Sequence, residues 1–506
     1  MQQEAIFYDP TLRRWRYLKI ASASGAAFAV LTVALFTFSL RGVDLPGLPG
    51  ITTRLRQSIR RGIHLPPHQT RLQLFAAKQE RKKLLDQIQH DNQISLVRSA
   101  KPPIKGNNIV AAFYAPWLET GLHSLQANAS HMTHLMPSWV HLQEDARGLD
   151  FHDWDPAMVP HNIDVLKIAR ENNLNIMPVF SNAQMSDFDP KRVHILLTDT
   201  KIQTDRILDL RRWVLMNRFQ GINVDLENIP DADYALYLPF LRRMKTLFGQ
   251  YHLAVSVDLE AGRSMDWREV SSICDFVVVM AYDEHGAGTK TPGPIASINW
   301  YRAVLDRAVR EIPSDKLVLG LANYAYDWAD GRDWADSMNY QSALITAEKY
   351  RDGETPEQIV DFDDKNLNPT FEYDDDAGTH HVVWFLDAVT AANQWVLARN
   401  KGVHGVAVWV LGSTDPSMWE FLDRHTLTRP PDMRALQKVS FPYDVDFEGE
   451  GEIARVYSNP TAGSRSLEID QRTGLILDES YHTFPKSYVI TRSGYQPKMV
   501  ALTIDD

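Results

Sequence analysis

Two acidic residues follow one another closely at the end of an apolar run that is typical of a buried strand. Residues 219–229 read FQGINVDLENI, so that one residue separates Asp225 from Glu227. Side chains at positions i and i+2 of a strand point to the same face, about 6–7 Å apart along the backbone. Both carboxylates are therefore expected on one face, where they could bind a divalent cation or act as an acid–base pair on a glycosidic bond. A solvated strand end without a chemical role is the third interpretation.

The cation interpretation needs more oxygen ligands than this strand offers, because hard divalent cations take six or more. Asp258 and Asp283 are the further carboxylates that the neighbouring strand candidates supply. The single cysteine, Cys274, excludes a cysteine-based zinc cage and an intramolecular disulfide. His380 and His381 are adjacent and would point to opposite faces of a strand, which favours structural roles. We therefore expect neither a metal nor another cofactor.

The elements that must position the two acids are read from the hydrophobic pattern. Apolar, β-rich runs are separated by helix-like stretches such as 201–218, 232–249, 299–311 and 384–400. The strand candidates are residues 109–115, 134–139, 175–181, 221–227, 253–259, 276–282, 317–323 and 405–411. Strands that alternate with helices indicate parallel βα units, and eight units between residues 107 and 430 predict an α/β fold, a (β/α)8 TIM barrel.

In such a barrel the chemistry belongs at the carboxyl ends of the strands. Several of the candidate strands end in polar or aromatic residues, namely Tyr114, Trp117, Trp139, Asp225, Glu227, Asp258, Tyr282, Asp283, Tyr324 and Trp409. Trp117, Trp139 and Trp328 could line a substrate groove, although tryptophans in a barrel are as often plain core residues. The Asp225–Glu227 pair thus lies where aromatic side chains are also expected.

At this point the chain is recognisable, because GINVDLE resembles the DGxDxDxE strand of glycoside hydrolase family 18, the chitinase-like barrels. VMAYDEHG is similar to the family's sixth-strand MxYD motif, GLANYAYDW to its seventh-strand segment, and GVAVWVLGSTDPSMW to its eighth-strand tryptophan segment. FEYDDDAGTHHVVWFLDAVTAANQWVLA is similar to a stretch of the spore-cortex-lytic branch. The resemblance covers roughly residues 107 to 430 and implies a glycosidase.

The resemblance also implies roles for individual residues. Glu227 aligns with the proton donor, and Asp225 aligns with the acid that orients the N-acetyl group of the substrate and stabilises an oxazolinium ion. In this family the carbonyl oxygen of the substrate is the nucleophile, an exception to the scheme with two enzymic carboxylates. Tyr282 aligns with the hydroxyl that binds the N-acetyl oxygen, Asp283 neighbours it, and Trp409 aligns with the aromatic floor under the sugar. The other expected substrate contacts are Asn223, Met280, Tyr114, Tyr324 and Trp328.

Two acids of the family motif are replaced in this chain. Gln220 stands at the first acidic position, where we expect a role in strand packing, and Asn223 stands at the middle one. An acid at position 223 could share a proton with Asp225, whereas Asn223 gives Asp225 a neutral hydrogen-bonding neighbour. The replacements leave open a rival from another class, a carbohydrate-binding barrel that holds a polymer without cutting it.

The substrate implied by the resemblance is a β-1,4-linked N-acetylglucosamine polymer, such as chitin, peptidoglycan glycan or an exopolysaccharide. The bulk composition is that of an ordinary globular protein, since 44% of the 506 residues are hydrophobic, and the formal net charge is -11. A phosphate-binding surface needs concentrated Lys and Arg. We therefore expect no nucleic-acid partner.

The N-terminal part of the chain contains a long uncharged run that is unlike the rest of the sequence. Residues 20–40 contain no charge and are long enough to cross a bilayer as a helix, which predicts a membrane-bound protein with a transmembrane signal anchor. No small-residue cleavage site follows Leu40, which argues against a cleaved signal peptide. Basic residues nearly balance on the two sides, and we favour a cytoplasmic N-terminus (1–19) with the barrel in the periplasm or outside the cell. Residues 41–106 are expected to form a linker and a juxtamembrane helix.

The C-terminal part is expected to be a small β-rich connector over residues 431–496, followed by the start of another domain at 497–506. VALTIDD resembles the opening strand of the polysaccharide deacetylases, which aligns Asp505 with a catalytic base and Asp506 with a metal ligand. This order of segments resembles bacterial envelope proteins that fuse a family-18-like barrel, a deacetylase and a family 2 glycosyltransferase. The downstream domains would then be partners of the barrel, and the chain a fragment or a short gene product.

Overall fold

The computed structural model describes residues 109–184, 187–263, 265–403, 405–427, 429–430, 432–441, 445–451 and 453–494. These residues all belong to the larger of two compact units, Phe75–Asp506. The predicted anchor at 20–40, the linker at 41–106 and the deacetylase-like segment at 497–506 lie outside the described residues. Within the described ranges, no helix combines the length and the hydropathy needed to cross a bilayer.

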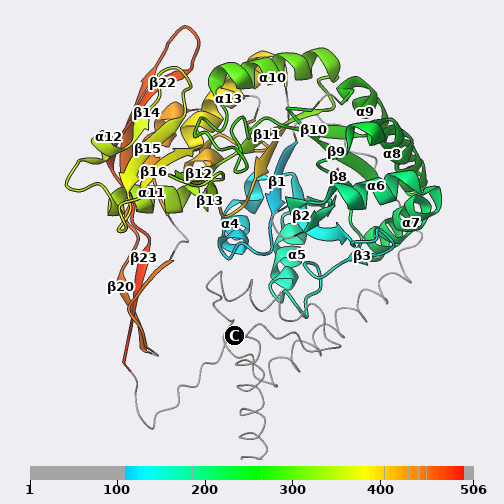
Figure 1. Ribbon diagram of the computed structural model, residues 1–506, viewed down its shortest axis with the longest axis horizontal. Coiled ribbons are helices and arrows are strands. Elements are labelled where there is room, and N and C mark those ends of the chain that lie inside the picture. Colours follow the sequence, from blue (N-terminus) through cyan, green and yellow to red (C-terminus); the bar gives the residue numbers. More distant parts are fainter. Residues whose placement is uncertain are drawn as a thin grey trace, which may run out of the picture. The chain divides into compact units, whose positions relative to one another are not determined.

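Parallel strands close into a barrel, in the order β1-β17-β11-β10-β9-β8-β5-β2, and pairing of β2 with β1 completes the ring (Figure 1). The strands are β1 (Val110–Tyr114), β2 (His134–Leu142), β5 (Val179–Ser181), β8 (Gly221–Asp225), β9 (Ala254–Glu260), β10 (Phe276–Met280), β11 (Leu317–Ala322) and β17 (Val406–Trp409). Each lies in or overlaps one predicted strand, and the predicted (β/α)8 barrel is confirmed. The third predicted strand is split, because β4 (Asn175–Ile176) pairs with β2 separately from β5.

Helices lie around the barrel strands in Figure 1. They are α4 (Thr120–Asn128), α5 (Asn162–Glu171), α6 (Pro190–Thr198), α7 (Thr200–Met216), α8 (Tyr234–Gly249), α9 (Trp267–Ile273), α10 (Ile298–Glu311) and α13 (Ala388–Asn400). The predicted helical segments correspond to α7, α8, α10 and α13. Helix α7 begins where sequence rules place it, after Asp199, whose carboxylate accepts hydrogen bonds from the Lys201 and Ile202 amides.

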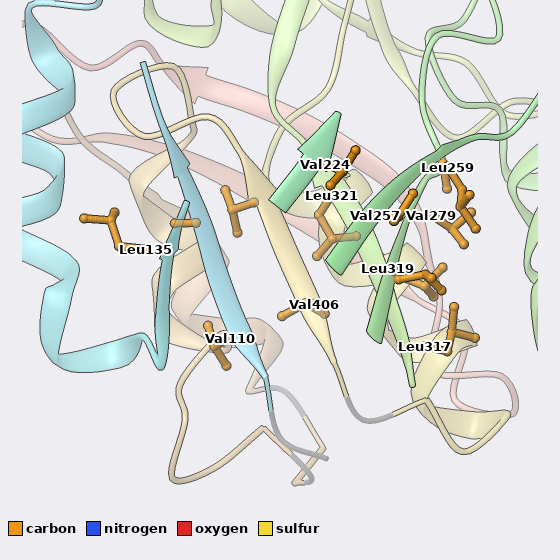
Figure 2. Packing of buried hydrophobic residues seen from close by; sticks show 14 of the residues in the cluster. Val110, Leu135, Val224, Val257, Leu259, Val279, Leu317, Leu319, Leu321 and Val406 are labelled. Carbon is orange, nitrogen blue, oxygen red and sulfur yellow. The ribbon is translucent and has the colours of Figure 1, made fainter. Parts of the chain in front are cut away.

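The barrel has two apolar layers because alternate residues of each strand point to opposite faces. In β1, Val110 and Ala112 pack outward against the helices, whereas Ala111 and Phe113 pack inside the barrel. Figure 2 shows part of the outer layer, in which labelled aliphatic side chains of neighbouring strands gather, among them Val224 and Val257. Each such fully buried side chain contributes about 1.5–3 kcal/mol relative to an exposed one. The apolar layers hold the strand ends, and therefore the site, in fixed register.

A second sheet is inserted between β11 and β17, and the sequence analysis did not anticipate it. Its antiparallel strands follow the order β13-β12-β16-β15-β14. They are β12 (Tyr324–Ala329), β13 (Asp336–Asn339), β14 (Asp361–Phe362), β15 (Pro369–Asp374) and β16 (His380–Phe385), with helices α11 (Tyr340–Lys349) and α12 (Pro356–Ile359) between them. The predicted helix at 384–400 begins too early, because residues 380–385 belong to β16.

The C-terminal part is β-rich, as predicted. One sheet has the order β18-β21-β22 and the other β19-β23-β20. The strands are β18 (Lys438–Val439), β19 (Val445–Glu448), β20 (Ile453–Ser458), β21 (Gly463–Ile469), β22 (Ile476–Thr483) and β23 (Tyr488–Ser493). The first sheet packs against the barrel unit, since the Asn393 side chain of α13 exchanges two hydrogen bonds with the Ile476 backbone (2.7 and 2.8 Å).

Candidate active site

Asp225 and Glu227 lie at the carboxyl end of β8. Asp225 is the last residue of the strand and only 6% exposed, whereas Glu227 is half-buried. The Asn182 side chain fixes the backbone at Glu227, because its Nδ2 donates to Glu227 O and its Oδ1 accepts from Glu227 N, both at 3.0 Å. Asn228 then adopts a left-handed conformation (φ 54°), a conformation that Asn tolerates better than most residues. The two carboxyl groups are thus held at the barrel rim by backbone contacts.

The two carboxyl groups share a hydrogen bond that sets their protonation. Burial raises the pKa of both, and the negative charge of Asp225 raises the pKa of Glu227 further. The hydrogen bond from Glu227 lowers the pKa of Asp225 in return. The proton therefore resides on Glu227, and Asp225 accepts it as a hydrogen bond. Burial raises the pKa of Asp225 to about 7; above that pH Glu227 keeps its proton beside an ionised carboxylate, which is the arrangement that general acid catalysis on a glycoside needs.

Asn223 directs its hydrogen bonds to the next strand rather than to Asp225. Its Nδ2 donates to Asp258 Oδ2 (2.6 Å) and its Oδ1 accepts from Ser256 Oγ (2.6 Å), both on β9. This differs from the expectation that Asn223 would be the hydrogen-bonding neighbour of Asp225. Burial and the charge of Asp225 raise the pKa of Asp258, which brings a third carboxyl group into the site.

Gln220 has the packing role that was expected of it. Its Oε1 accepts from the Ile176 amide (2.8 Å) and its Nε2 donates to the Arg218 carbonyl (2.9 Å). The first bond joins the residue before β8 to β4, at the end of the strand opposite to Asp225, and the second stays within the segment that leads into β8. The first replaced acid of the family motif is therefore a structural residue in this chain.

Tyr282 and Asp283 follow β10 and lie near the carboxyl groups. Burial raises the pKa of Tyr282, and the negative charges of Asp258 and Asp283 raise it further, so that the hydroxyl stays protonated and can donate. Asp283 has a left-handed backbone (φ 64°), and its Oδ1 accepts hydrogen bonds from the hydroxyls of Tyr324 and Tyr326. Two tyrosines of the inserted sheet thus fix the residue next to Tyr282.

The predicted aromatic contacts gather in one cluster beside these groups. Tyr282, Tyr324, Tyr326 and Trp328 are buried in it, and Met280 and Trp409 pack against it. The ring centroids of Tyr282 and Tyr324 are 6.2 Å apart, and those of Trp409 and Phe113 are 5.2 Å apart in a T-shaped arrangement. Trp328 Nε1 donates to the Thr289 carbonyl (2.9 Å). The structure therefore brings together Met280, Tyr282, Tyr324, Trp328 and Trp409, and their contact with a substrate stays a prediction.

Three other aromatic candidates lie elsewhere. Tyr114 is fully buried in the layer between β1 and the helices, where a Cβ at Gly121 of α4 would lie 3.2 Å from its ring, so the structure does not place it with the other site residues. Trp139 is also a core residue, and its Nε1 donates to Asn162 Oδ1 (3.1 Å). Trp117 is 56% exposed in the loop after β1.

His141 and Ser181 also belong to the site, and the sequence analysis missed them. His141 Nδ1 lies 2.8 Å from Ser181 Oγ, and Ser181 pairs in register with Asp225. The signal that could have found Ser181 is its position at the carboxyl end of a strand. Across the described ranges, no group of three or more His, Cys, Asp or Glu has the geometry of a metal site.

Comparison with known proteins gives a family match and several relatives. The model of the glycosyl hydrolases family 18 matches residues 109–414. The "Uncharacterized glycosylase YvbX" of Bacillus subtilis is 29% identical over 280 residues, which cover 52% of this chain and 78% of that protein. The "Cortical fragment-lytic enzyme" of Bacillus subtilis is 27% identical over 279 residues, covering 52% of this chain and 63% of that enzyme.

Among solved structures, the spore cortex-lytic enzyme SleL of Bacillus megaterium superposes with a TM-score of 0.54. It is 24% identical in sequence, and the superposition covers 66% of this chain and 80% of that one. This likeness shows a shared fold.

Proposed function

The chain belongs to the glycosyl hydrolases of family 18 and is a glycosidase of that family, and we propose that it hydrolyses β-1,4-linked N-acetylglucosamine polymers by substrate-assisted catalysis with retention. The observation that carries the proposal is the hydrogen-bonded Asp225–Glu227 pair, in which Glu227 holds the proton. The aromatic cluster around Tyr282 and Trp409 supports it, since apolar ring faces suit the C–H faces of pyranoses.

In the proposed reaction, Glu227 donates its proton to the glycosidic oxygen as the bond to the leaving sugar breaks. The N-acetyl carbonyl oxygen of the substrate attacks the anomeric carbon and forms an oxazolinium ion, whose positive charge the Asp225 carboxylate stabilises. Tyr282 donates a hydrogen bond to the same carbonyl oxygen. Water then attacks the anomeric carbon while the Glu227 carboxylate takes its proton, which restores the acid and retains the configuration.

The raised pKa of Glu227 suits the first step, because an acid that is still protonated near neutral pH can donate at the pH where most enzymes work. Loss of this proton leaves two carboxylates side by side, and their repulsion favours taking a proton back from water in the second step. The pair therefore serves both halves of the reaction.

The first experiment replaces Glu227 by Gln, which keeps the size of the side chain and removes the transferable proton. We expect hydrolysis of N-acetylglucosamine oligosaccharides, followed by mass spectrometry of the products, to fall about 10²–10⁴-fold while binding persists. Glu171→Gln, at the exposed end of α5, is the matched control and should leave turnover unchanged. Unchanged turnover in Glu227→Gln would end the proposal.

The name of the Bacillus subtilis relative, a cortical fragment-lytic enzyme, favours peptidoglycan fragments as the first polymer to test. Chitin oligosaccharides and exopolysaccharides with the same sugar are the alternatives. Side-by-side assays on the three polymers would rank them by kcat/KM.

The second candidate function is a barrel that binds such a polymer without cutting it. The presence of Gln220 and Asn223 at two acidic positions of the family motif favours it. Calorimetry that shows tight oligosaccharide binding by the wild-type chain, together with no product after days of incubation, would support this function over hydrolysis.

We also propose that residues 20–40 anchor the protein in a membrane with the barrel outside the cytoplasm. The support is the uncharged run and the basic residues on both of its sides. If the proposal holds, the full chain sediments with membranes and a chain lacking residues 20–40 does not. Protease added to intact cells or spheroplasts would then cut the barrel; a protected barrel would reverse the proposed orientation.

We further propose that the barrel works beside deacetylase and family 2 glycosyltransferase domains that act on the same polymer. The support is the resemblance of VALTIDD to the opening strand of a polysaccharide deacetylase. The genomic sequence that follows the codon of Asp506 tests this proposal directly.

A further inference from the structure

Strand β12 of the inserted sheet turns one face toward the loop that follows β10. Tyr324, Tyr326 and Trp328 alternate along β12, and alternate residues of a strand point to the same face. All three side chains are buried in the aromatic cluster that also contains Tyr282. One strand of the inserted sheet therefore borders the proposed catalytic residues.

The polar ends of these three side chains bind two positions of the loop. The hydroxyls of Tyr324 and Tyr326 both donate to Asp283 Oδ1, the second at a distance of 2.8 Å. Trp328 Nε1 donates to the Thr289 carbonyl oxygen at 2.9 Å. Both tyrosine bonds converge on one oxygen atom, which fixes the Asp283 side chain against β12.

The position of β12 is itself fixed by its neighbours. The strand pairs with β13 along one edge and with β16 along the other. Beyond the end of β12, the Ala335 amide donates to the Ala287 carbonyl oxygen of the loop at 2.8 Å. The loop after β10 is thus held by a strand that has hydrogen-bonded partners on both sides.

Asp283 has a backbone conformation that needs such support. Its φ of 64° is left-handed, a region that is uncommon for a residue with a Cβ and that persists where surrounding contacts hold it. The peptide bond between Tyr282 and Asp283 is planar, so a change of φ at Asp283 tilts the plane to which the Tyr282 backbone belongs. The hydrogen bonds to Asp283 therefore also determine where the Tyr282 side chain points.

We propose that Tyr326 is a positioning residue for Tyr282: its hydroxyl, together with that of Tyr324, holds Asp283 in the left-handed conformation and so aims the Tyr282 hydroxyl at the substrate amide. Tyr326 is only 8% exposed and its hydroxyl is already bound to Asp283, so it acts through Asp283 rather than on the sugar. The inference deepens the proposed hydrolysis and rests on it for its catalytic meaning.

The same strand offers a matched control on its opposite face. Asp327 lies between Tyr326 and Trp328, and its Oδ2 accepts a hydrogen bond from the Tyr373 hydroxyl of β15 at 2.8 Å. Tyr373→Phe therefore removes the same kind of bond, from a phenol to a carboxyl group, on the side of β12 that faces away from the site. His381 Nδ1 lies 2.8 Å from Asp327 Oδ1, so Asp327 keeps a partner in this variant.

The experiment compares Tyr326→Phe with the wild-type full chain on an N-acetylglucosamine oligosaccharide. The change removes the hydroxyl and keeps the ring, so the packing of the aromatic cluster is preserved. We expect kcat to fall about tenfold while KM changes less than about twofold, because the Tyr282 hydroxyl is needed mainly in the transition state. In a Tyr282→Phe background, Tyr326→Phe should cause no further loss of kcat, since its effect passes through Tyr282. Tyr373→Phe should leave kcat unchanged.

A second measurement follows Tyr282 without the reaction. Fluorine NMR of the chain labelled with 3-fluorotyrosine gives a signal for Tyr282, which is identified by its loss in Tyr282→Phe. This signal should move in Tyr326→Phe and in Asp283→Ala, which removes the acceptor at an exposed residue, and should stay in place in Tyr373→Phe. Asp283→Ala decides the matter if Tyr326→Phe does not fold.

The inference is overturned if the Tyr282 signal stays in place in both Tyr326→Phe and Asp283→Ala. It is also overturned by an unchanged kcat in Tyr326→Phe, or by losses of kcat that multiply when Tyr326→Phe and Tyr282→Phe are combined. A Tyr282 signal that moves as expected, in a wild-type chain that hydrolyses nothing, would keep the positioning role and reject the proposed hydrolysis instead.

Discussion

At the scale of single residues, Glu260 adds a negative charge beside the acid–base pair. It ends β9, where its charge raises the pKa of both Asp225 and Glu227, and Arg263 Nε lies 3.3 Å from its Oε1. A like charge disfavours ionisation of its neighbours. Glu260 therefore adds to the effect of burial and shifts the working pH range of the pair upward, although it takes no part in the proposed reaction.

Glu260→Gln should consequently lower the pKa of both Asp225 and Glu227. In the proposed mechanism, the acid limb of the kcat/KM profile reports ionisation of Asp225 and the basic limb reports loss of the Glu227 proton, so both limbs should move to lower pH. We expect a shift of about half a pH unit, since Glu260 is partly exposed and its field is screened. The control is Glu269→Gln on α9, which removes a surface ion pair with Arg242 and should shift neither limb. If the acid and basic limbs of the kcat/KM profile do not move in Glu260→Gln, the charge of Glu260 does not influence the pair.

The sequence predicted the residues that stand within one motif and missed those that only the fold brings together. Asp225 and Glu227 are close along the chain, and their common face follows from strand geometry. Asn182 follows β5 and His141 stands on β2, and their contacts with Glu227 and with Ser181 depend on the register between strands. Register also explains why the Asn223 amide was assigned to Asp225, although it bonds to Ser256 and Asp258.

At the scale of elements, the barrel strands were predictable because parallel strands covered on both faces are apolar nearly throughout. The inserted sheet was not, although YAYDWA (β12) and HHVVWF (β16) are rich in aromatic and β-branched residues. A local pattern does not tell which sheet a strand joins. The start of α13 was missed for a related reason, since Asp387 caps the helix at Thr390 and β16 ends just before it.

Gly320 of β11 shows how one strand position shapes the site. A Cβ at this residue would lie 3.0 Å from Tyr282 Cε1 and 3.0 Å from the Val279 carbonyl oxygen, which is tighter than ordinary packing. Gly320→Ala should therefore displace the Tyr282 ring and with it the hydroxyl that we propose binds the substrate amide. We expect kcat to fall at least about tenfold, because small misplacements of a positioning group are costly.

The control for this prediction is Gly249→Ala at the end of α8, where an added Cβ has no heavy atom within 4 Å. It should leave kcat unchanged and raise the stability slightly, as alanine favours helices. Steady-state kinetics and thermal melting distinguish the two variants. A Gly320→Ala enzyme with wild-type kcat would show that the Tyr282 ring can shift without a catalytic consequence.

At the scale of the whole described unit, the C-terminal β18-β21-β22 sheet is joined to the barrel by a buried charge network rather than by a loose connection. Arg465 of β21 is fully buried and contacts the carboxylates of Asp387 (3.2 Å), Asp415 (2.9 Å) and Glu479 (2.9 Å). The sequence predicted the β-rich composition of this region, yet not these contacts, because the partners of Arg465 stand just before α13, on the loop after β17 and on β22.

This network leads toward the active site. The Asp415 amide donates to Asn323 Oδ1 (3.1 Å), and Ser413 Oγ donates to the Asn323 carbonyl (2.9 Å). Asn323 immediately precedes Tyr324, which fixes Asp283, and the loop that holds Asp415 follows Trp409. The C-terminal sheet thus supports two strands whose ends carry site residues.

Arg465→Met should lower the free energy of unfolding by about 3–5 kcal/mol, because it leaves buried carboxylates without their counter-charge. Burial and the charge of Asp387 already raise the pKa of Glu479, and removal of the guanidinium raises it further. A carboxyl group whose pKa is higher in the folded state than in the unfolded one stabilises the fold less as pH rises above its ordinary value of about 4. The variant should therefore be more strongly destabilised at pH 8 than at pH 5.

Urea denaturation followed by tryptophan fluorescence at the two pH values measures this difference. Arg455→Met on the exposed strand β20 is the control and should change the midpoint little at either pH. If the sheet is part of the barrel unit, the midpoint of the barrel transition itself shifts in Arg465→Met. A separate early transition with an unmoved barrel midpoint would mean that the sheet can detach while the site stays intact, and the support of Tyr324 and Trp409 by this network would then have to be abandoned.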